Sequence, residues 1–175
     1  MDVPPASSDE SAAVMSIGEM GFAAARSLAA RYNLQLERSP ADEPIAGSFW
    51  GAPEAGILGR RILVREDTPV HSFLHEMSHI ICMSPAIRDS HTGNAESDDL
   101  EEAAVCYLQI LLADQLAGVG SGRLIRDMDA WGYSFRLGST RCWFEQDAED
   151  ARAWLLRQSI ITTSEELTFR LRQTV

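Results

Sequence analysis

Two histidines and a glutamate stand close together near the middle of the chain, in the run HEMSH at residues 75–79. This run matches H-E-x-x-H, and the surrounding stretch, 70–83, is largely apolar and contains no glycine or proline. In a helix, His75 and His79 lie one turn apart on the same face, where two imidazoles can bind one Zn²⁺. Glu76 can then reach a water on that metal and act as its general base. The pattern therefore predicts metal-dependent hydrolysis.

A hydrolytic zinc site usually has three protein ligands and one open position, so His75 and His79 need one further partner. Glycine and histidine at the positions of Cys82 and Pro85 would complete a metzincin site, and neither is present. The remaining candidates are polar residues farther along the chain: His91, Glu96, Asp98, Asp99, Glu101 and Glu102. The residues by themselves leave the choice among these open.

The motif and a second stretch together resemble the compact gluzincins of the ImmA/IrrE type. The second stretch, EEAAVCYL at 101–108, aligns with their pattern Glu-x-x-Ala-Asn-x-Phe-Ala, with Val105 in place of the asparagine. The resemblance covers about residues 60–118 and implies that Glu101 is the third ligand. It also implies a minimal zincin-like fold with the motif on a central helix, zinc as the cofactor, and a peptide or protein as the substrate.

SprT-like proteases are the second resemblance, because they share His-Glu-Met before the second histidine. They take their third ligand from a downstream histidine that is often followed by glycine, and His91 with Gly93 close behind it resembles that arrangement. Their DNA-linked role fits poorly with an acidic chain. We therefore expect Glu101 as the third ligand, with Glu102 and His91 as the alternatives.

Charge and composition narrow the partners and the compartment. The chain has 15 basic and 26 acidic residues, a net charge of −11, which disfavours nucleic acid and anionic membranes as partners. No apolar stretch is long enough to span a bilayer, and the first residues lack the pattern of a secretory signal. The three cysteines are an odd number, which favours reduced thiols and a cytoplasmic protein.

The helices and strands that must position the motif are predicted to form an α+β fold, with a small antiparallel sheet packed against a helical bundle. Residues 1–9 are expected to be a flexible tail, and 10–175 one zincin-like domain. Periodicity and capping signals predict helices at 11–32, 69–83, 98–116, 124–131, 148–157 and 164–173, strands at 34–37, 48–50, 56–58 and 61–65, and a loop at 86–97. The strand at 62–64 is expected to be an edge strand that pairs with an extended peptide.

These expectations together describe a cytoplasmic zinc metallopeptidase, with His75, His79 and Glu101 as ligands and Glu76 as the general base. The alternative is a zincin-like regulatory or binding module with a structural or weakly active metal site. A peptidase also needs a donor for the developing oxyanion, and the sequence does not choose among its candidates: Tyr107, Tyr133, His91, Arg136 and Arg141.

Overall fold

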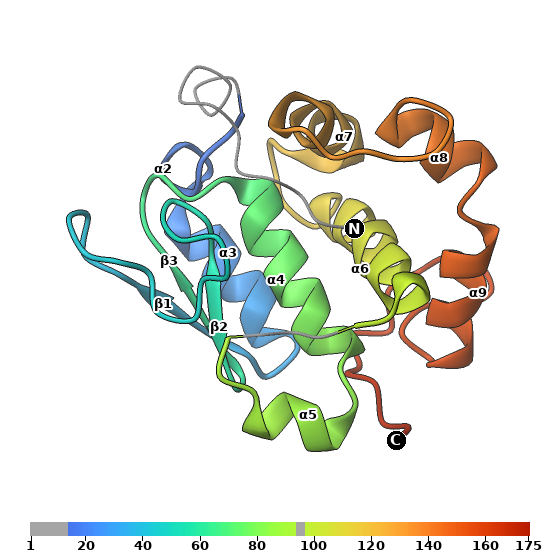
Figure 1. Cartoon of the computed structure of the whole chain (residues 1–175), viewed down its shortest axis with the longest axis horizontal. Coiled ribbons are helices and arrows are strands. Elements are labelled where there is room, and N and C mark those ends of the chain that lie inside the picture. The colour runs from blue at the N-terminus through green and yellow to red at the C-terminus, as the bar shows by residue number, and fades with distance from the viewer. Residues whose placement is uncertain (1–13, 94–96) are drawn as a thin grey trace.

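The computed structural model describes residues 14–93 and 97–175. The expected tail at 1–9 and the candidate ligand Glu96 lie outside these residues. The described residues form eight helices and a three-stranded sheet, an α+β architecture as predicted (Figure 1). None of these helices combines the length and the apolar composition that crossing a bilayer requires.

The sheet contains the strands β1 (Gln35–Arg38), β2 (Gly56–Leu58) and β3 (Arg61–Val64) in the order β1-β3-β2. The strands β2 and β3 are antiparallel, because the turn at Gly59, with φ 59°, joins them directly. Strand β1 runs parallel to β3, so the sheet is mixed and the prediction of an antiparallel sheet is wrong for β1. A long connection separates β1 from β2, which allows the chain to return on the far side of β3.

Strand β3 is central, so the prediction that residues 62–64 form an edge strand is wrong. The edge next to the motif helix is β2, and part of that edge is covered by the chain itself. Ile57 donates its backbone N–H to the carbonyl of Gly47 at 3.3 Å. The expected strand at 48–50 does not form.

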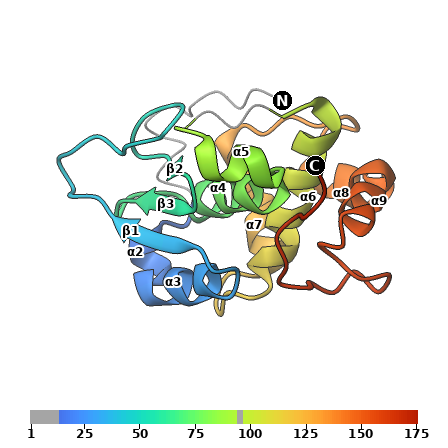
Figure 2. The same cartoon turned by 90° about the horizontal axis from the view of Figure 1, so that it is seen from below.

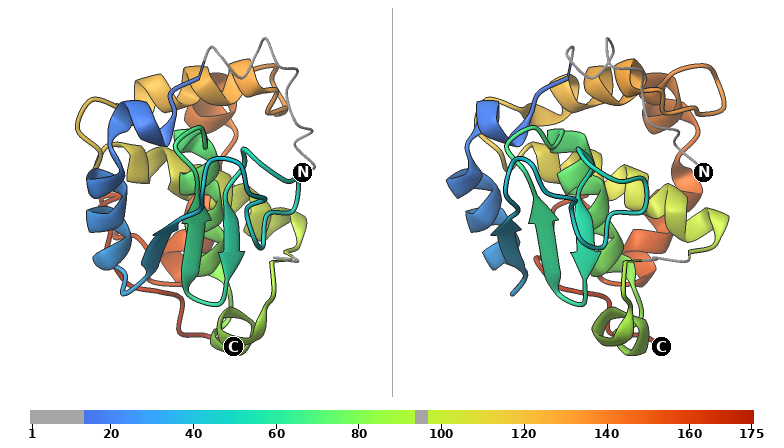
Figure 3. Two further views of the ribbon diagram at one scale, coloured as in Figure 1. Left: turned by 90° about the vertical axis from the view of Figure 1, so that its left-hand side faces the viewer. Right: turned by 60° about the vertical axis from the view of Figure 1, so that its left-hand side comes forward.

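The helices are α2 (Ile17–Met20), α3 (Phe22–Ala30), α4 (Val70–Cys82), α5 (Pro85–Ser90), α6 (Asp99–Ala113), α7 (Gly120–Trp131), α8 (Thr140–Gln146) and α9 (Glu149–Arg157). Seen from the sheet side, α4 lies behind β2 and β3 (Figure 3). On its other side α4 packs along α6, so that α4 lies between β3 and α6 (Figure 2). The motif helix therefore occupies the centre of the fold.

Helix α4 is buried along most of its length because its apolar side chains face the sheet on one side and α6 on the other. The helix begins at Val70, one residue after the predicted start, because Pro69 has an extended ψ of 140° and is the N-cap instead of the first helical residue. At the other end, the buried guanidinium of Arg88 donates hydrogen bonds to the carbonyls of Ile80, Ile81 and Met83. These bonds satisfy carbonyls that the end of a helix leaves unpaired.

The predicted helix at 11–32 is divided in the described residues, because Gly21 adopts φ 107° between α2 and α3. In the expected loop at 86–97 the chain forms α5, and α8 was not predicted. The predicted helix at 164–173 is wrong. This segment forms a bridge between Ile161 and Leu167, and its Arg172 N–H bonds to the carbonyl of Ile81 in α4. Contacts with the rest of the molecule outweigh the weak helical pattern here.

Candidate metal centre

Three donor groups from two packed helices meet at one point. His75 and His79 come from α4 and Glu102 from the first turn of α6. The two Nε2 atoms are 3.1 Å apart. Glu102 places Oε1 3.1 Å from His75 Nε2 and Oε2 3.2 Å from His79 Nε2. The side chains of His75, His79 and Glu102 are only 13%, 7% and 10% exposed, so the group is largely buried between the two helices.

Local structure explains why Glu102 reaches this position. Asp98 is the N-cap of α6, and its carboxylate accepts the backbone N–H of Glu101 at 2.8 Å. This cap fixes the direction of the first turn, from which Glu102 projects toward α4. Ser97 donates its hydroxyl to Glu102 Oε2 at 3.0 Å, which restrains the carboxylate further. The helix start thus holds the ligand candidate at the level of the two imidazoles.

The spacing of these donors fits a divalent metal ion. Zinc binds imidazole nitrogen and carboxylate oxygen at roughly 2.0–2.1 Å, so two ligand atoms at a tetrahedral angle lie about 3.3 Å apart. Here the two Nε2 atoms are 3.1 Å apart, and each lies 3.1 or 3.2 Å from a different oxygen of the Glu102 carboxylate, which is close to that value. Two neutral imidazoles that each aim a lone pair at the other would repel, whereas an ion between them accepts both lone pairs. The donor set of two nitrogens and one carboxylate oxygen is also one that zinc accepts.

The protonation states of the metal-free group differ among the three donors. Burial acts to lower the pKa of His75, but Tyr133 and Glu102 raise it well above its usual value, so His75 has to release a proton when a metal binds. Burial acts to raise the pKa of Glu102, but the neighbouring imidazoles of His75 and His79 lower it to about 2. Burial lowers the pKa of His79 to about 3, and the charge of His75 acts in the same direction. Glu102 is therefore an anion and His79 a neutral imidazole at neutral pH, which are the forms that act as ligands.

Glu76 follows His75 in α4 and is half-buried. Burial raises the pKa of its carboxyl to about 7; His75 lowers it, and the carboxylates of Glu102 and Glu54 raise it. No hydrogen bond holds its side chain among the residues with described positions. A carboxyl with these properties can take up and release a proton near neutral pH.

Three further residues lie near His75: Gln109 and Glu54, which the sequence did not single out, and Tyr133, which it offered as a candidate oxyanion donor. Gln109, fully buried in α6, lies with its Oε1 2.7 Å from His75 Nδ1. Tyr133, after α7, packs its ring edge-on to that of His75, with the centroids 6.0 Å apart. The Tyr133 hydroxyl lies 3.2 Å from Nδ1 of His71. Glu54 accepts a hydrogen bond from Trp131 Nε1 at 2.9 Å and is 8% exposed.

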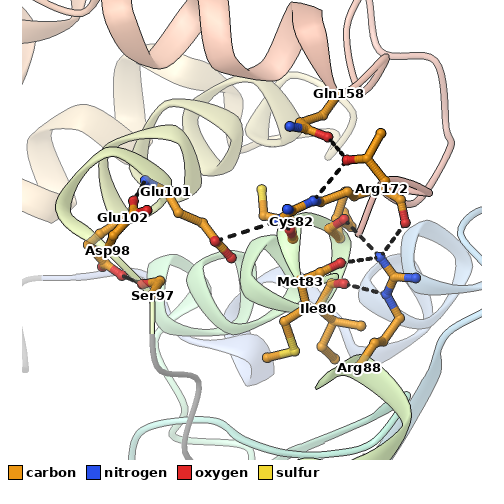
Figure 4. A network of polar contacts seen from close by, with 12 residues as sticks. Ile80, Cys82, Met83, Arg88, Ser97, Asp98, Glu101, Glu102, Gln158 and Arg172 are labelled. Carbon is orange, nitrogen blue, oxygen red and sulfur yellow. Dashed lines mark hydrogen bonds and ion pairs between the residues drawn. The ribbon is translucent and has the colours of Figure 1, made fainter. Parts of the chain in front are cut away.

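Glu101, the expected third ligand, points elsewhere. Its carboxylate lies 3.5 Å from the guanidinium of Arg172, which also donates to the carbonyl of Cys82 at 3.2 Å (Figure 4). Burial raises the pKa of Glu101, and Arg172 opposes that rise. The structure does not bring Glu101 to the imidazoles, and the carboxylate that lies beside them is that of Glu102. The reason is rotational, since adjacent residues of a helix project about 100° apart.

The alternative ligand His91 is also placed away from the group. Its Nε2 lies 2.9 Å from the carbonyl oxygen of Gly59, at the β2–β3 turn. It is the C-cap residue of α5, the helix that precedes α6 in the chain. Within the described residues, the cluster of possible metal donors contains His75, His79 and Glu102 alone.

A signal for Glu102 was present in the sequence. Glu102, Cys106 and Gln109 recur at the spacing of one helix face, and Gln109 is a polar residue within an apolar run. A buried amide needs a hydrogen-bond partner, so the helix face that contains Gln109 could be expected to pack against the polar side chains of the motif helix.

Comparisons of the chain with protein-family models, with curated proteins and with solved structures found no match.

Proposed function

We propose that this chain is a zinc-dependent metallopeptidase whose metal is bound by His75, His79 and Glu102. The observation that carries the proposal is the convergence of these three donors at separations of 3.1–3.2 Å. In the described part of the chain no further histidine, cysteine or carboxylate joins the group. Three protein ligands with a remaining open position are typical of catalytic zinc, whereas structural zinc has four.

Zinc bound there would polarise a carbonyl and lower the pKa of a water molecule to about 7. Glu76 is the general base in this proposal: it takes a proton from the attacking water and delivers it to the leaving amine. Its pKa of about 7 suits both transfers at neutral pH, because a carboxyl with a much lower pKa would be a weak base.

Tyr133 is the donor that we assign to the developing oxyanion. Of the five candidates, Tyr107 donates to Glu165, and the other three contact Asp147, Glu145 and the Gly59 carbonyl. The Tyr133 hydroxyl also has a contact, with His71 Nδ1 at 3.2 Å, but Tyr133 is the candidate whose ring packs against His75. Burial raises the pKa of its hydroxyl, so it keeps the proton that a donor needs.

The test compares the wild-type protein with Glu76→Gln. Zinc is measured by elemental analysis after dialysis, and hydrolysis by mass spectrometry of a peptide library. We expect about one zinc per chain in both proteins and hydrolysis only by the wild type. Full activity of the variant would overturn the assignment of Glu76, and a wild-type protein without zinc would overturn the metal site. Zinc without hydrolysis of any peptide would favour the regulatory or binding module.

A further inference from the structure

Gln109 is an unusual residue for its position in α6. Its side chain is fully buried, and its neighbours along the helix, Leu108 and Ile110, are apolar and buried as well. Burying an amide costs free energy unless both of its polar ends are hydrogen-bonded. The contacts of Gln109 therefore show what it does.

Both ends of this amide contact α4. The oxygen Oε1 lies 2.7 Å from His75 Nδ1, and the nitrogen Nε2 donates to the backbone carbonyl of His71 at 3.4 Å. Since an amide oxygen can only accept, the hydrogen of this bond belongs to His75 Nδ1. In a neutral imidazole the lone pair is then on Nε2, the atom that faces His79 and Glu102.

The second imidazole is held differently. Among the described residues, the buried Nδ1 of His79 has no hydrogen-bond partner. His75 is thus the ligand whose ring is oriented by a side chain of the neighbouring helix. The same helix supplies Glu102 two turns earlier, so the position of α6 sets both the carboxylate donor and the orientation of His75.

We propose that Gln109 is a positioning residue that fixes the tautomer and the ring orientation of His75 for metal binding. This inference rests on the proposed metal site. Such outer partners of ligand histidines commonly change metal affinity by about 10–100-fold when they are removed. Gln109 acts through His75, and it does not itself contact the metal or the substrate.

The test uses three variants. Gln109→Leu removes the acceptor and keeps a similar volume, whereas Gln109→Glu keeps an oxygen acceptor in the same place. Gln115→Leu is the matched control, because Gln115 contacts Arg31 instead of the site. Zinc dissociation constants are measured by competition with a chromophoric chelator, and melting temperatures on the metal-free proteins.

We expect Gln109→Leu to bind zinc about 10–100-fold more weakly than the wild type, and Gln115→Leu to bind it as the wild type does. Gln109→Glu should restore the affinity to within a few-fold, although a buried carboxylate lowers the melting temperature of the metal-free protein. A purely structural residue would instead show affinity falling in step with stability in both variants. That parallel loss, or wild-type affinity in Gln109→Leu, would overturn the proposal.

A second reading of the same variants and one further measurement keep the test decisive. If Gln109→Leu does not fold without metal, Gln109→Glu decides alone, and a loss of tenfold or more in its zinc affinity rejects the positioning role. Nitrogen-15 NMR of the histidine rings in the metal-free wild type tests the tautomer directly. A hydrogen on Nε2 of neutral His75 would reject the proposal even if zinc binds. A wild-type protein that shows the expected Nδ1 hydrogen but binds no zinc would refute the proposed function instead.

Discussion

The assignment of Glu102 as the third ligand leads to the sharpest prediction, because Glu101 next to it is a natural control. The variants Glu102→Gln and Glu101→Gln make the same chemical change at adjacent positions of one helix turn. Both keep the size of the side chain and remove one negative charge. Only Glu102 lies within 3.2 Å of the two imidazoles, while Glu101 contacts Arg172.

The expected loss of affinity can be worked out from the ligand count. Zinc sites with four protein ligands are worth about 10–16 kcal/mol at neutral pH, so one ligand contributes about 2.5–4 kcal/mol. At about 1.4 kcal/mol for each factor of ten, Glu102→Gln should weaken zinc binding by about 60- to 700-fold. Glu101→Gln should weaken it less than about threefold.

The same substitution also affects the metal-free protein. The pKa of Glu102 falls from 4.5 to about 2 on folding, which corresponds to about 3 kcal/mol of stability at neutral pH. Because the folded pKa is the lower one, this stability is present above pH 4.5 and is lost as the pH falls toward 2. Urea denaturation of the metal-free Glu102→Gln protein should therefore show a loss of up to about 3 kcal/mol.

The assay combines zinc competition titration with urea denaturation of each metal-free protein, so that affinity and stability are measured separately. If Glu101→Gln loses zinc and Glu102→Gln keeps it, the reasoning is refuted, and Glu101 is the ligand as the gluzincin resemblance implies. If neither variant changes zinc affinity, neither carboxylate is a ligand.

Three further predictions follow from the surroundings of the site. Burial lowers the pKa of His71 from 6.5 in the unfolded chain to about 3 in the folded protein, so protonation at acid pH favours the unfolded state. When the pH falls from 7.5 to 5, the free energy of unfolding of the metal-free wild type should therefore decrease by about 2 kcal/mol more than that of His71→Gln, as measured by urea denaturation. Arg88→Ala should lower the free energy of unfolding by at least about 3 kcal/mol in urea denaturation, because it leaves buried carbonyls without donors. The exposed control Arg60→Ala should lower it by under about 1 kcal/mol. Equal losses in the two variants would contradict the capping role of Arg88. Tyr133→Phe should lower kcat by about 100-fold with zinc content unchanged, and an unchanged kcat would remove Tyr133 from the mechanism.

Local patterns were sufficient for much of the fold. The strands at Gln35–Arg38 and Arg61–Val64 and the helices at Val70–Cys82 and Asp99–Ala113 were predicted close to their observed bounds. Each has its signal within its own residues: a strand alternation, a proline at the helix start, or an aspartate cap. The segment 164–173 failed because its backbone groups bond to α4 and to nearby turns, and no local pattern reports such partners.

The partnership of His75 and His79 is a property of the sequence itself. Their spacing places both imidazoles on one face of any helix that contains them, whatever the rest of the chain does. The third donor is different, because it depends on how α6 is rotated about its axis against α4. That rotation is set by which side chains are buried between the two helices, and a single residue step turns a side chain by about 100°. The sequence therefore determined the pairing of the two imidazoles, and only the tertiary structure placed Glu102 instead of Glu101 beside them and brought Gln109 to His75.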